Sequence, residues 1–243
     1  MAVTIENLTE ADVAATIDHS LLRPELTAAE LDAGLALACE YAVASVCIHP
    51  CEVPRAIDAL AGSTVVVGTV VGFPHGAHAT AAKVFEAERS VDAGVAELDM
   101  VLNIGWLRSG RDDDVTADIR AVVEAADGRL VKVILENAYL DDDQKVRGCH
   151  AVEAAGAQFV KTSTGFAPSG ATIADLTLMR ASVSPHIQVK AAGGVRTLDA
   201  LIQVMNVGVT RIGATATKAI IDDFRDRKAG GPGTPGGELG GGY

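Results

Sequence analysis

Short apolar runs alternate with longer amphipathic runs along most of the chain. The valine-rich run from Thr64 to Phe73 shows no regular alternation with polar residues, which predicts a strand buried on both faces. The run from Ala28 to Tyr41 instead has an amphipathic, helical pattern, and it follows Thr27, a favoured N-cap residue. We therefore expect strands and helices to alternate.

The whole pattern predicts eight strands and eight helices in strict alternation. The expected strands are residues 16–19, 44–48, 64–73, 97–102, 130–135, 158–162, 187–191 and 210–212. The expected helices are residues 28–41, 52–60, 77–93, 113–126, 141–155, 172–181, 198–207 and 217–225. An open doubly wound sheet usually has fewer strands in this length, and the glycine-rich dinucleotide turn after the first strand is missing. We predict an α/β fold, the eight-stranded parallel (β/α)8 TIM barrel.

Composition favours one domain with a tail. The chain has 243 residues, of which 49% are hydrophobic and 21% charged, as expected for a single globular core. From Ala229 the sequence becomes AGGPGTPGGELGGGY, too rich in glycine and proline to bury much apolar surface. We expect a barrel domain over residues 1–228 and a flexible tail over residues 229–243.

Charge and targeting signals narrow the possible partners. The formal net charge is −12, which argues against a nucleic-acid-binding surface. We see neither a secretory signal at the start of the sequence nor an apolar run long enough to span a membrane. The expected location is the cytoplasm. The four cysteines, at positions 39, 47, 51 and 149, are expected to be reduced thiols because their spacing matches no zinc or redox motif.

Two lysines close successive apolar strands, Lys161 in FVKTSTGF and Lys190 in VKAAGGVR. Burial disfavours an ammonium and so favours the neutral, nucleophilic amine. A second ammonium about 4 Å away would add about 4 kcal/mol at an effective dielectric near 20, or about 3 pKa units. We expect Lys161 to be the nucleophile and Lys190 to lower its pKa, although this argument alone would also allow the reverse.

The last two loops of the predicted barrel carry a pattern typical of phosphate sites. In such barrels, catalytic groups lie at the C-terminal ends of the strands, and phosphate is often bound after strands seven and eight. Glycines let backbone N–H groups approach phosphate oxygens, and the helix N-termini near Thr197 and Thr217 favour an anion. The candidate substrate- and phosphate-binding residues are Gly165, Gly193, Gly194, Arg196, Gly213 and Thr215.

Eight motifs in order resemble deoxyribose-phosphate aldolases. They are TIDHSLLRPELT, VCIHP, VVGFPHG, ELDMVLN, VKVILEN, FVKTSTGF, VKAAGGVR and RIGAT, and they span the chain to about Arg225. The resemblance implies a class I aldolase that reversibly cleaves 2-deoxy-D-ribose 5-phosphate to acetaldehyde and D-glyceraldehyde 3-phosphate. It also implies a Schiff base on Lys161, no cofactor, no metal and a homodimer.

Within that resemblance, Asp99 matches an aspartate that works with the second lysine and a water in proton transfer. Asp99 could instead form only a structural ion pair with Lys190. Asp18, expected at the end of the first strand, is a candidate for contact with a substrate hydroxyl group. Lys132 is expected at the far rim of the barrel, with a structural role.

The sequence departs from the family pattern at two positions. Ala216 stands where many members have a second serine, and Phe166 follows Gly165 where some have a lysine. Both changes remove groups that would hold phosphate, which leaves Arg196 as the expected cation. We therefore expect weaker phosphate binding than in other members.

Three other functions are compatible with parts of the sequence. His75 and His78, with His49 or His19, could suggest a zinc-dependent class II aldolase, but loop histidines without a carboxylate pattern are usually surface residues. A phosphate-binding isomerase would share the phosphate loops without needing paired lysines. A non-catalytic sugar-phosphate sensor would also bind the same small molecules.

Tyr243 ends the glycine-rich tail. About fifteen flexible residues have a root-mean-square reach of roughly 20 Å, so the phenol could arrive at the strand ends. Some members of the resembling family also end in a tyrosine that is thought to assist proton transfer. We predict that Tyr243 relays a proton to or from the carbon next to the imine.

Overall fold

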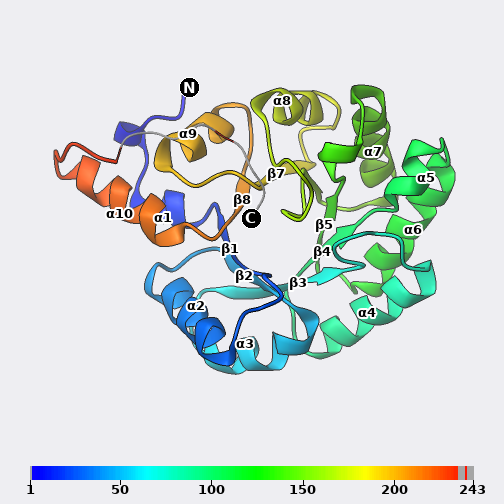
Figure 1. Ribbon diagram of the computed structural model, residues 1–243, viewed down its shortest axis with the longest axis horizontal. Coiled ribbons are helices and arrows are strands. Elements are labelled where there is room, and N and C mark those ends of the chain that lie inside the picture. Colours follow the sequence, from blue (N-terminus) through cyan, green and yellow to red (C-terminus); the bar gives the residue numbers. More distant parts are fainter. Residues whose placement is uncertain (1, 235–238, 240–243) are drawn as a thin grey trace.

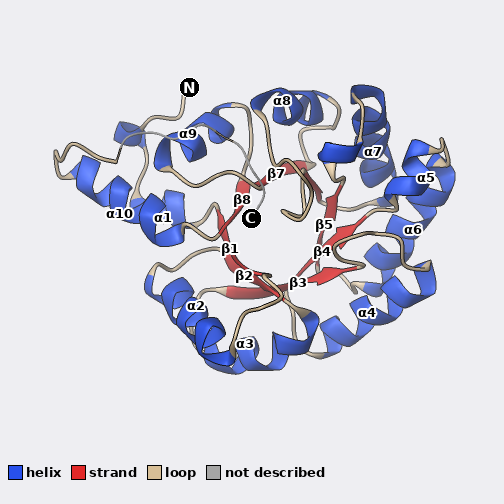
Figure 2. Cartoon of the chain, in the orientation of Figure 1, coloured by secondary structure: helices blue, strands red, loops and turns tan. Residues whose placement is uncertain are grey.

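The fold is a closed barrel of eight parallel strands surrounded by helices (Figures 1 and 2). A computed structural model describes residues 2–234 and 239 of the chain. The strands are β1 Ile17–Leu21, β2 Ser45–Ile48, β3 Val66–Val71, β4 Glu97–Val101, β5 Leu130–Ile134, β6 Phe159–Lys161, β7 Gln188–Ala192 and β8 Arg211–Ala214. They pair in chain order, and β8 closes the barrel on β1. The predicted (β/α)8 barrel is confirmed.

The predicted helices are all present, with ends displaced by a few residues. The helices are α1 Glu10–Ala14, α2 Ala28–Glu40, α3 Val53–Ala59, α4 Thr80–Asp92, α5 Ile104–Arg108, α6 Asp112–Ala125, α7 Asp142–Ala155, α8 Ile173–Ala181, α9 Leu198–Asn206 and α10 Thr217–Lys228. Short 3-10 turns cover Ile5–Asn7, Pro50–Glu52 and Asn137–Tyr139. The sequence analysis did not predict α1 or α5, which are each five residues long.

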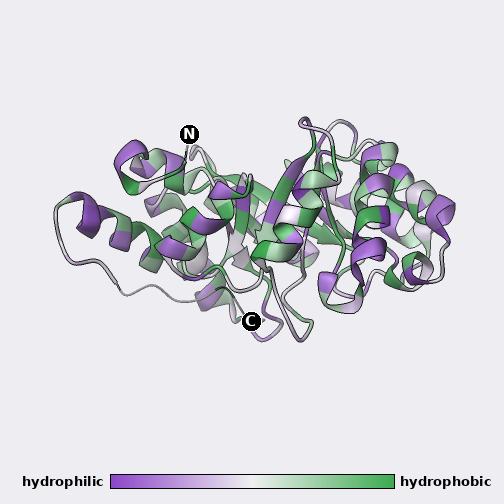
Figure 3. Cartoon of the chain, turned by 90° about the horizontal axis from the view of Figure 1, so that it is seen from above, coloured by the Kyte–Doolittle hydropathy of each residue, from purple (hydrophilic) through white to green (hydrophobic). Residues whose placement is uncertain are grey.

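Local signals in the sequence explain where helices begin and end. The Thr27 hydroxyl accepts a hydrogen bond from the Glu30 backbone N–H, and the Glu30 carboxylate accepts one from the Thr27 backbone N–H, which forms a capping box at the start of α2. Helix α7 ends at Gly156, whose φ of 85° is left-handed and therefore suits glycine. Figure 3 shows hydrophobic and hydrophilic residues side by side on the helices, as amphipathic helices require.

The strands alternate between two environments with a period of two. One set of side chains, including Leu98, Met100 and Val133, is buried in the main apolar core. The alternate set includes charged side chains that meet in a cluster. Asp99 on β4 and Lys132 on β5, for example, are register partners, and their side chains form a hydrogen bond. Successive side chains on a strand point to opposite faces. The main core thus lies in the layer between strands and helices, and the charged cluster lies inside the barrel.

The described start of the predicted tail is bound to α10. The Gly231 and Gly233 backbones donate to Asp226, and Arg227 donates to the Thr234 carbonyl. Leu239 contacts the main apolar core. The boundary between a domain over residues 1–228 and a flexible tail stays a prediction. Tyr243 lies outside the described residues.

Candidate active site

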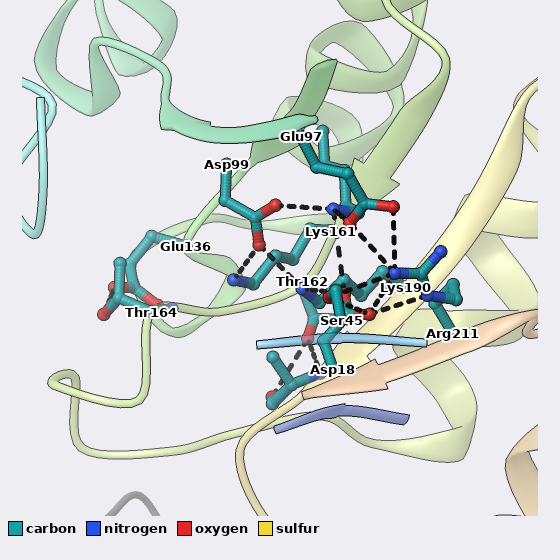
Figure 4. A network of polar contacts seen from close by, with 12 residues as sticks. Asp18, Ser45, Glu97, Asp99, Glu136, Lys161, Thr162, Thr164, Lys190 and Arg211 are labelled. Atoms are coloured by element: carbon teal, nitrogen blue, oxygen red, sulfur yellow. Dashed lines mark hydrogen bonds and ion pairs between the residues drawn. The ribbon is translucent and has the colours of Figure 1, made fainter. Parts of the chain in front are cut away.

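The two predicted catalytic lysines meet at one carboxylate oxygen. Lys161 Nζ and Lys190 Nζ each lie 2.7 Å from Asp99 Oδ2, and all three residues are at most 3% exposed. Lys161 is the last residue of β6, as predicted. Lys190 was expected to close its strand but lies two residues before the end of β7, because that strand continues to Ala192. Figure 4 shows Asp99 facing both lysines.

The two lysines have opposite electrostatic environments. Burial lowers the pKa of Lys161, Asp99 opposes this and Lys190 adds to it. Burial also disfavours the Lys190 ammonium, but Asp18 and Asp99 outweigh it and raise its pKa well above the ordinary value. Lys190 has this second carboxylate because its Nζ lies 2.5 Å from Asp18 Oδ2. Of the two lysines, Lys161 is thus the one whose lowered pKa favours the neutral amine.

Asp18 and Lys132 differ from their predicted positions. Asp18 is the second residue of β1, which continues to Leu21, so it does not end the strand. Its carboxylate contacts Lys190, Arg211 and Ser45. The expectation of Lys132 at the far rim was wrong. Its ammonium is buried beneath the site, 2.9 Å from Asp99 Oδ1 and 2.6 Å from Glu97 Oε2.

A cavity of about 450 Å³ opens above these lysines. Lys161, Lys190 and Asp18 line one part of it, together with Cys47 and Thr164. Burial raises the pKa of the Cys47 thiol to about 11, which keeps it protonated. The Thr164 hydroxyl and backbone N–H both donate to Glu136, a buried residue with a left-handed φ of 60°. Glu136 thereby holds the loop that follows β6 against the cavity.

Most of the predicted phosphate residues line the same cavity. Its lining includes Gly193, Gly194, Arg196, Gly213 and Thr215. Gly193 and Gly194 have φ values of 78° and 95°, so their N–H groups take directions that other residues rarely allow. Gly213 was expected in a loop but lies inside β8. Gly165 makes the turn after Thr164 and is not among the described residues that line the cavity.

Helix α10 begins at this end of the cavity. Its N-cap residue is Ala216, and no side-chain cap hydrogen bond is found there among the described residues. The first N–H groups of a helix carry partial positive charge and favour an anion. Ala216, where the family resemblance implies a second serine, thus has no hydroxyl that could cap these backbone donors.

The histidines of the zinc alternative do not form a cluster. His19 Nδ1 lies 2.8 Å from Thr217 Oγ1, and His49 Nε2 lies 2.9 Å from the Leu22 carbonyl oxygen. In residues 2–234 and at 239, no group of three or more His, Cys, Asp or Glu side chains could hold a metal ion. The same residues include no helix long and apolar enough to cross a membrane.

The model of the DeoC/LacD family aldolases matches residues 12–223. The chain belongs to this family. It is 51% identical over 200 residues to deoxyribose-phosphate aldolase 1 of Staphylococcus aureus, covering 82% of this chain and 91% of that protein. It is 48% identical over 212 residues to deoxyribose-phosphate aldolase of Clostridium kluyveri, covering 87% and 97%.

A solved structure agrees with this membership. The tetrameric deoxyribose-phosphate aldolase of Aeropyrum pernix superposes with a TM-score of 0.84 and 27% identity, covering 92% of this chain and 95% of that one. The matched regions of all three relatives include most of the barrel. The family predicted from the motifs is therefore confirmed.

Proposed function

We propose that this chain is a class I deoxyribose-phosphate aldolase, which reversibly cleaves 2-deoxy-D-ribose 5-phosphate to acetaldehyde and D-glyceraldehyde 3-phosphate. The observation that carries the proposal is the pair of buried lysines on one Asp99 oxygen, of which only Lys161 has a lowered pKa. Neither a phosphate-binding isomerase nor a sugar-phosphate sensor requires a buried neutral lysine facing the cavity.

The reaction begins with the amine of Lys161. Its nitrogen attacks the aldehyde carbon of the open-chain sugar, and loss of water gives an iminium ion. The C3 hydroxyl then loses its proton, the C2–C3 bond breaks and D-glyceraldehyde 3-phosphate leaves. The bonding electrons remain on the iminium carbons as an enamine. Protonation of C2 and hydrolysis of the iminium release acetaldehyde and restore Lys161.

Asp99 and Lys190 are the proposed proton-handling groups. Asp99 Oδ2 accepts from both lysines, so it can exchange a proton with the Lys161 nitrogen or with a water placed beside it. Lys190 remains an ammonium and stabilises negative charge that develops on the substrate oxygen. Contact of a substrate hydroxyl with Asp18 stays a prediction, because this carboxylate already contacts Lys190 and Arg211.

The phosphate is proposed to lie at the glycine end of the cavity. Gly193, Gly194 and Thr215 would present N–H and hydroxyl groups there, and Arg196 and the α10 N-terminus would supply positive charge. Phe166 is 42% exposed and contacts Phe73 edge to face at 5.4 Å. An aromatic pair thus stands where some family members carry a lysine, which supports the expectation of weaker phosphate binding.

Imine trapping tests the proposal directly. Acetaldehyde and borohydride should leave one ethyl group on Lys161, located by peptide mass mapping. Lys218, whose side chain is 65% exposed, is the internal control and should remain largely unlabelled near neutral pH, because its hydrogen bonds to Asp222 and Tyr41 raise its pKa and keep it an ammonium there. An adduct confined to Lys190, or none at all, would sink the assignment.

Three further expectations accompany the proposal. Activity should persist in chelator, as the resemblance to class I aldolases implies.

Tyr243→Phe should slow deuterium exchange at the methyl group of bound acetaldehyde without changing imine trapping, and unchanged exchange would return Tyr243 to an inert role. The homodimer and the cytoplasmic location stay predictions, and light scattering would measure the first.

A further inference from the structure

Six charged side chains inside the barrel, five of them buried and Arg211 half-buried, form a closed ring of alternating charge. The ring runs through Asp99, Lys132, Glu97, Arg211, Asp18 and Lys190, and then back to Asp99. The nitrogen–oxygen distances include 2.9 Å for Lys132 to Asp99, 2.6 Å for Lys132 to Glu97 and 2.9 Å for Arg211 to Glu97. Figure 4 shows Asp18, Glu97 and Arg211 on the side of the network away from Glu136.

The ring contains three carboxylates and three cations, so its formal charge is zero without Lys161. Lys161 is not a member of the ring. Its one described ion pair joins it to the ring at Asp99 Oδ2. A protonated Lys161 would therefore add an unmatched positive charge in a buried site, which is costly. A neutral Lys161 donates one hydrogen bond to Asp99 and keeps its lone pair.

Apart from Asp99, none of the titratable groups that face Lys161 is a described ion-pair partner of its ammonium. Asp99 on β4 and Lys190 on β7 belong to the ring. Cys47 on β2 is a thiol whose pKa burial raises to about 11. Glu136, after β5, has a pKa raised by burial, and its carboxylate accepts hydrogen bonds from Thr164.

We propose that Glu97 and Arg211 are positioning residues that set the balance between neutral and protonated Lys161 by fixing the charge of this ring, with Glu97 favouring the ammonium and Arg211 opposing it. The proposal rests on the proposed function of Lys161 as the imine-forming residue. Glu97 reaches Lys161 through Lys132 and Asp99, and Arg211 reaches it through Asp18 and Lys190. Both residues lie on the side of the ring remote from the reacting amine, so their influence on Lys161 is electrostatic.

This role makes two isolated charge changes act in opposite directions. Glu97→Gln leaves the ring with one excess positive charge, which further disfavours the Lys161 ammonium and lowers its pKa. Arg211→Met leaves one excess negative charge and raises that pKa. A charge roughly 10 Å away shifts a pKa by about one unit at an effective dielectric near 20.

The test follows the rate of borohydride-trapped imine on Lys161 against pH, with acetaldehyde as the probe. The midpoint should fall by about one pH unit in Glu97→Gln and rise by about one unit in Arg211→Met. The double variant should return close to the original midpoint, because its ring is again neutral. Glu97→Asp and Arg211→Lys preserve charge and should preserve the midpoint.

A merely structural role gives a different result. If Glu97 and Arg211 were only structural, their variants would lower the trapping rate at every pH and leave the midpoint unchanged. That outcome would overturn the proposal, and so would midpoint shifts in the same direction for both single variants. If Arg211→Met fails to fold, Arg211→Gln takes its place, because glutamine is uncharged like methionine but polar. If the wild type is trapped on Lys161 and the midpoints of the variants do not move, only the role of the ring is contradicted. If the wild type is not trapped, the proposed function is contradicted as well.

Discussion

Lys161 and Lys190 are the same kind of residue on neighbouring strands, and the difference between them lies in their partners. Lys161 contacts Asp99, whereas Lys190 contacts Asp99 and Asp18. The second carboxylate stabilises the Lys190 ammonium, and the single shared carboxylate is insufficient to offset the burial of Lys161. A difference of one carboxylate thus separates the proposed nucleophile from the proposed permanent cation.

Lys190→Leu should raise the pKa of Lys161, because it removes a like charge and leaves Asp99 to pair with Lys161 alone. Imine trapping near pH 7 should slow at least tenfold, as about one pKa unit implies. The rate should partly recover at higher pH as the Lys161 ammonium deprotonates. Trapping measured across the pH range checks this, with Lys218→Leu as the exposed control. A pH profile unchanged from the wild type would remove Lys190 from this role.

Lys161, Lys190 and Asp99 could be predicted as candidates from the sequence, because charged residues in apolar strands are conspicuous and the family resemblance includes them, and the structure brings the three side chains together. The sequence analysis placed Lys132 wrongly and gave no role to Arg211. The stagger between strands decides which side chains meet inside a barrel, and strands β4, β5 and β8 lie far apart in the sequence. Alternation along a strand shows that Glu97 and Asp99 share a face, but it does not show what they contact.

At the scale of elements, the loop before α8 supports the loop after β7. The Ala171 N–H lies 3.1 Å from the Ala192 carbonyl oxygen and 2.9 Å from that of Gly193. A Cβ at Gly170 would lie only 2.3 Å from the Gly193 oxygen. This close approach explains a glycine at position 170 and connects it to the proposed phosphate site.

Gly170→Ala should displace Gly193 and weaken phosphate binding. We expect KM for 2-deoxyribose 5-phosphate to rise about tenfold, equivalent to about 1.4 kcal/mol. Turnover of unphosphorylated 2-deoxyribose should change little, because Lys161 and Lys190 are not displaced. Steady-state kinetics with both sugars measures the difference. Gly105→Ala is the control, since its Cβ would have no neighbour closer than 3.6 Å, and equal losses for both sugars would contradict the prediction.

The long elements were predictable and the short ones were not. Apolar runs and a capping residue at Thr27 identified strands and helices to within a few residues. Helix α5 was missed because Asn103 caps only five residues, a length too short for a periodic pattern. The end of β1 was placed too early because His19 and Ser20 are polar, although both are buried in the folded chain.

At the scale of the whole molecule, a buried histidine links stability to pH. His19 is 5% exposed, and burial lowers its pKa from 6.5 to about 4. Between about pH 6.5 and 4, the unfolded chain therefore binds a proton at His19 that the folded chain does not bind. The contribution of His19 to the free energy of unfolding is complete above about pH 6.5 and declines as pH falls towards 4. The loss from this residue approaches about 3 kcal/mol.

His19→Gln should remove this part of the pH dependence. Chemical denaturation at several pH values between about 7 and 4 should show a shallower decline in its free energy of unfolding than in the wild type. His186→Gln should keep the wild-type slope, because the His186 side chain is 73% exposed. Identical slopes in all three proteins would show that His19 does not control acid stability.

The depth of the charged ring also determines how the protein responds to dissolved salt. Mobile ions screen exposed charges within about 10 Å at 0.1 M ionic strength but cannot enter a site whose carboxylates are at most 6% exposed. Arg196, at the cavity, is exposed. Raising sodium chloride from about 0.05 to about 0.5 M should therefore increase KM for the phosphorylated sugar and leave acetaldehyde trapping on Lys161 unchanged. Imine formation at Lys161 would then be independent of ionic strength, while binding of the anionic substrate would depend on it.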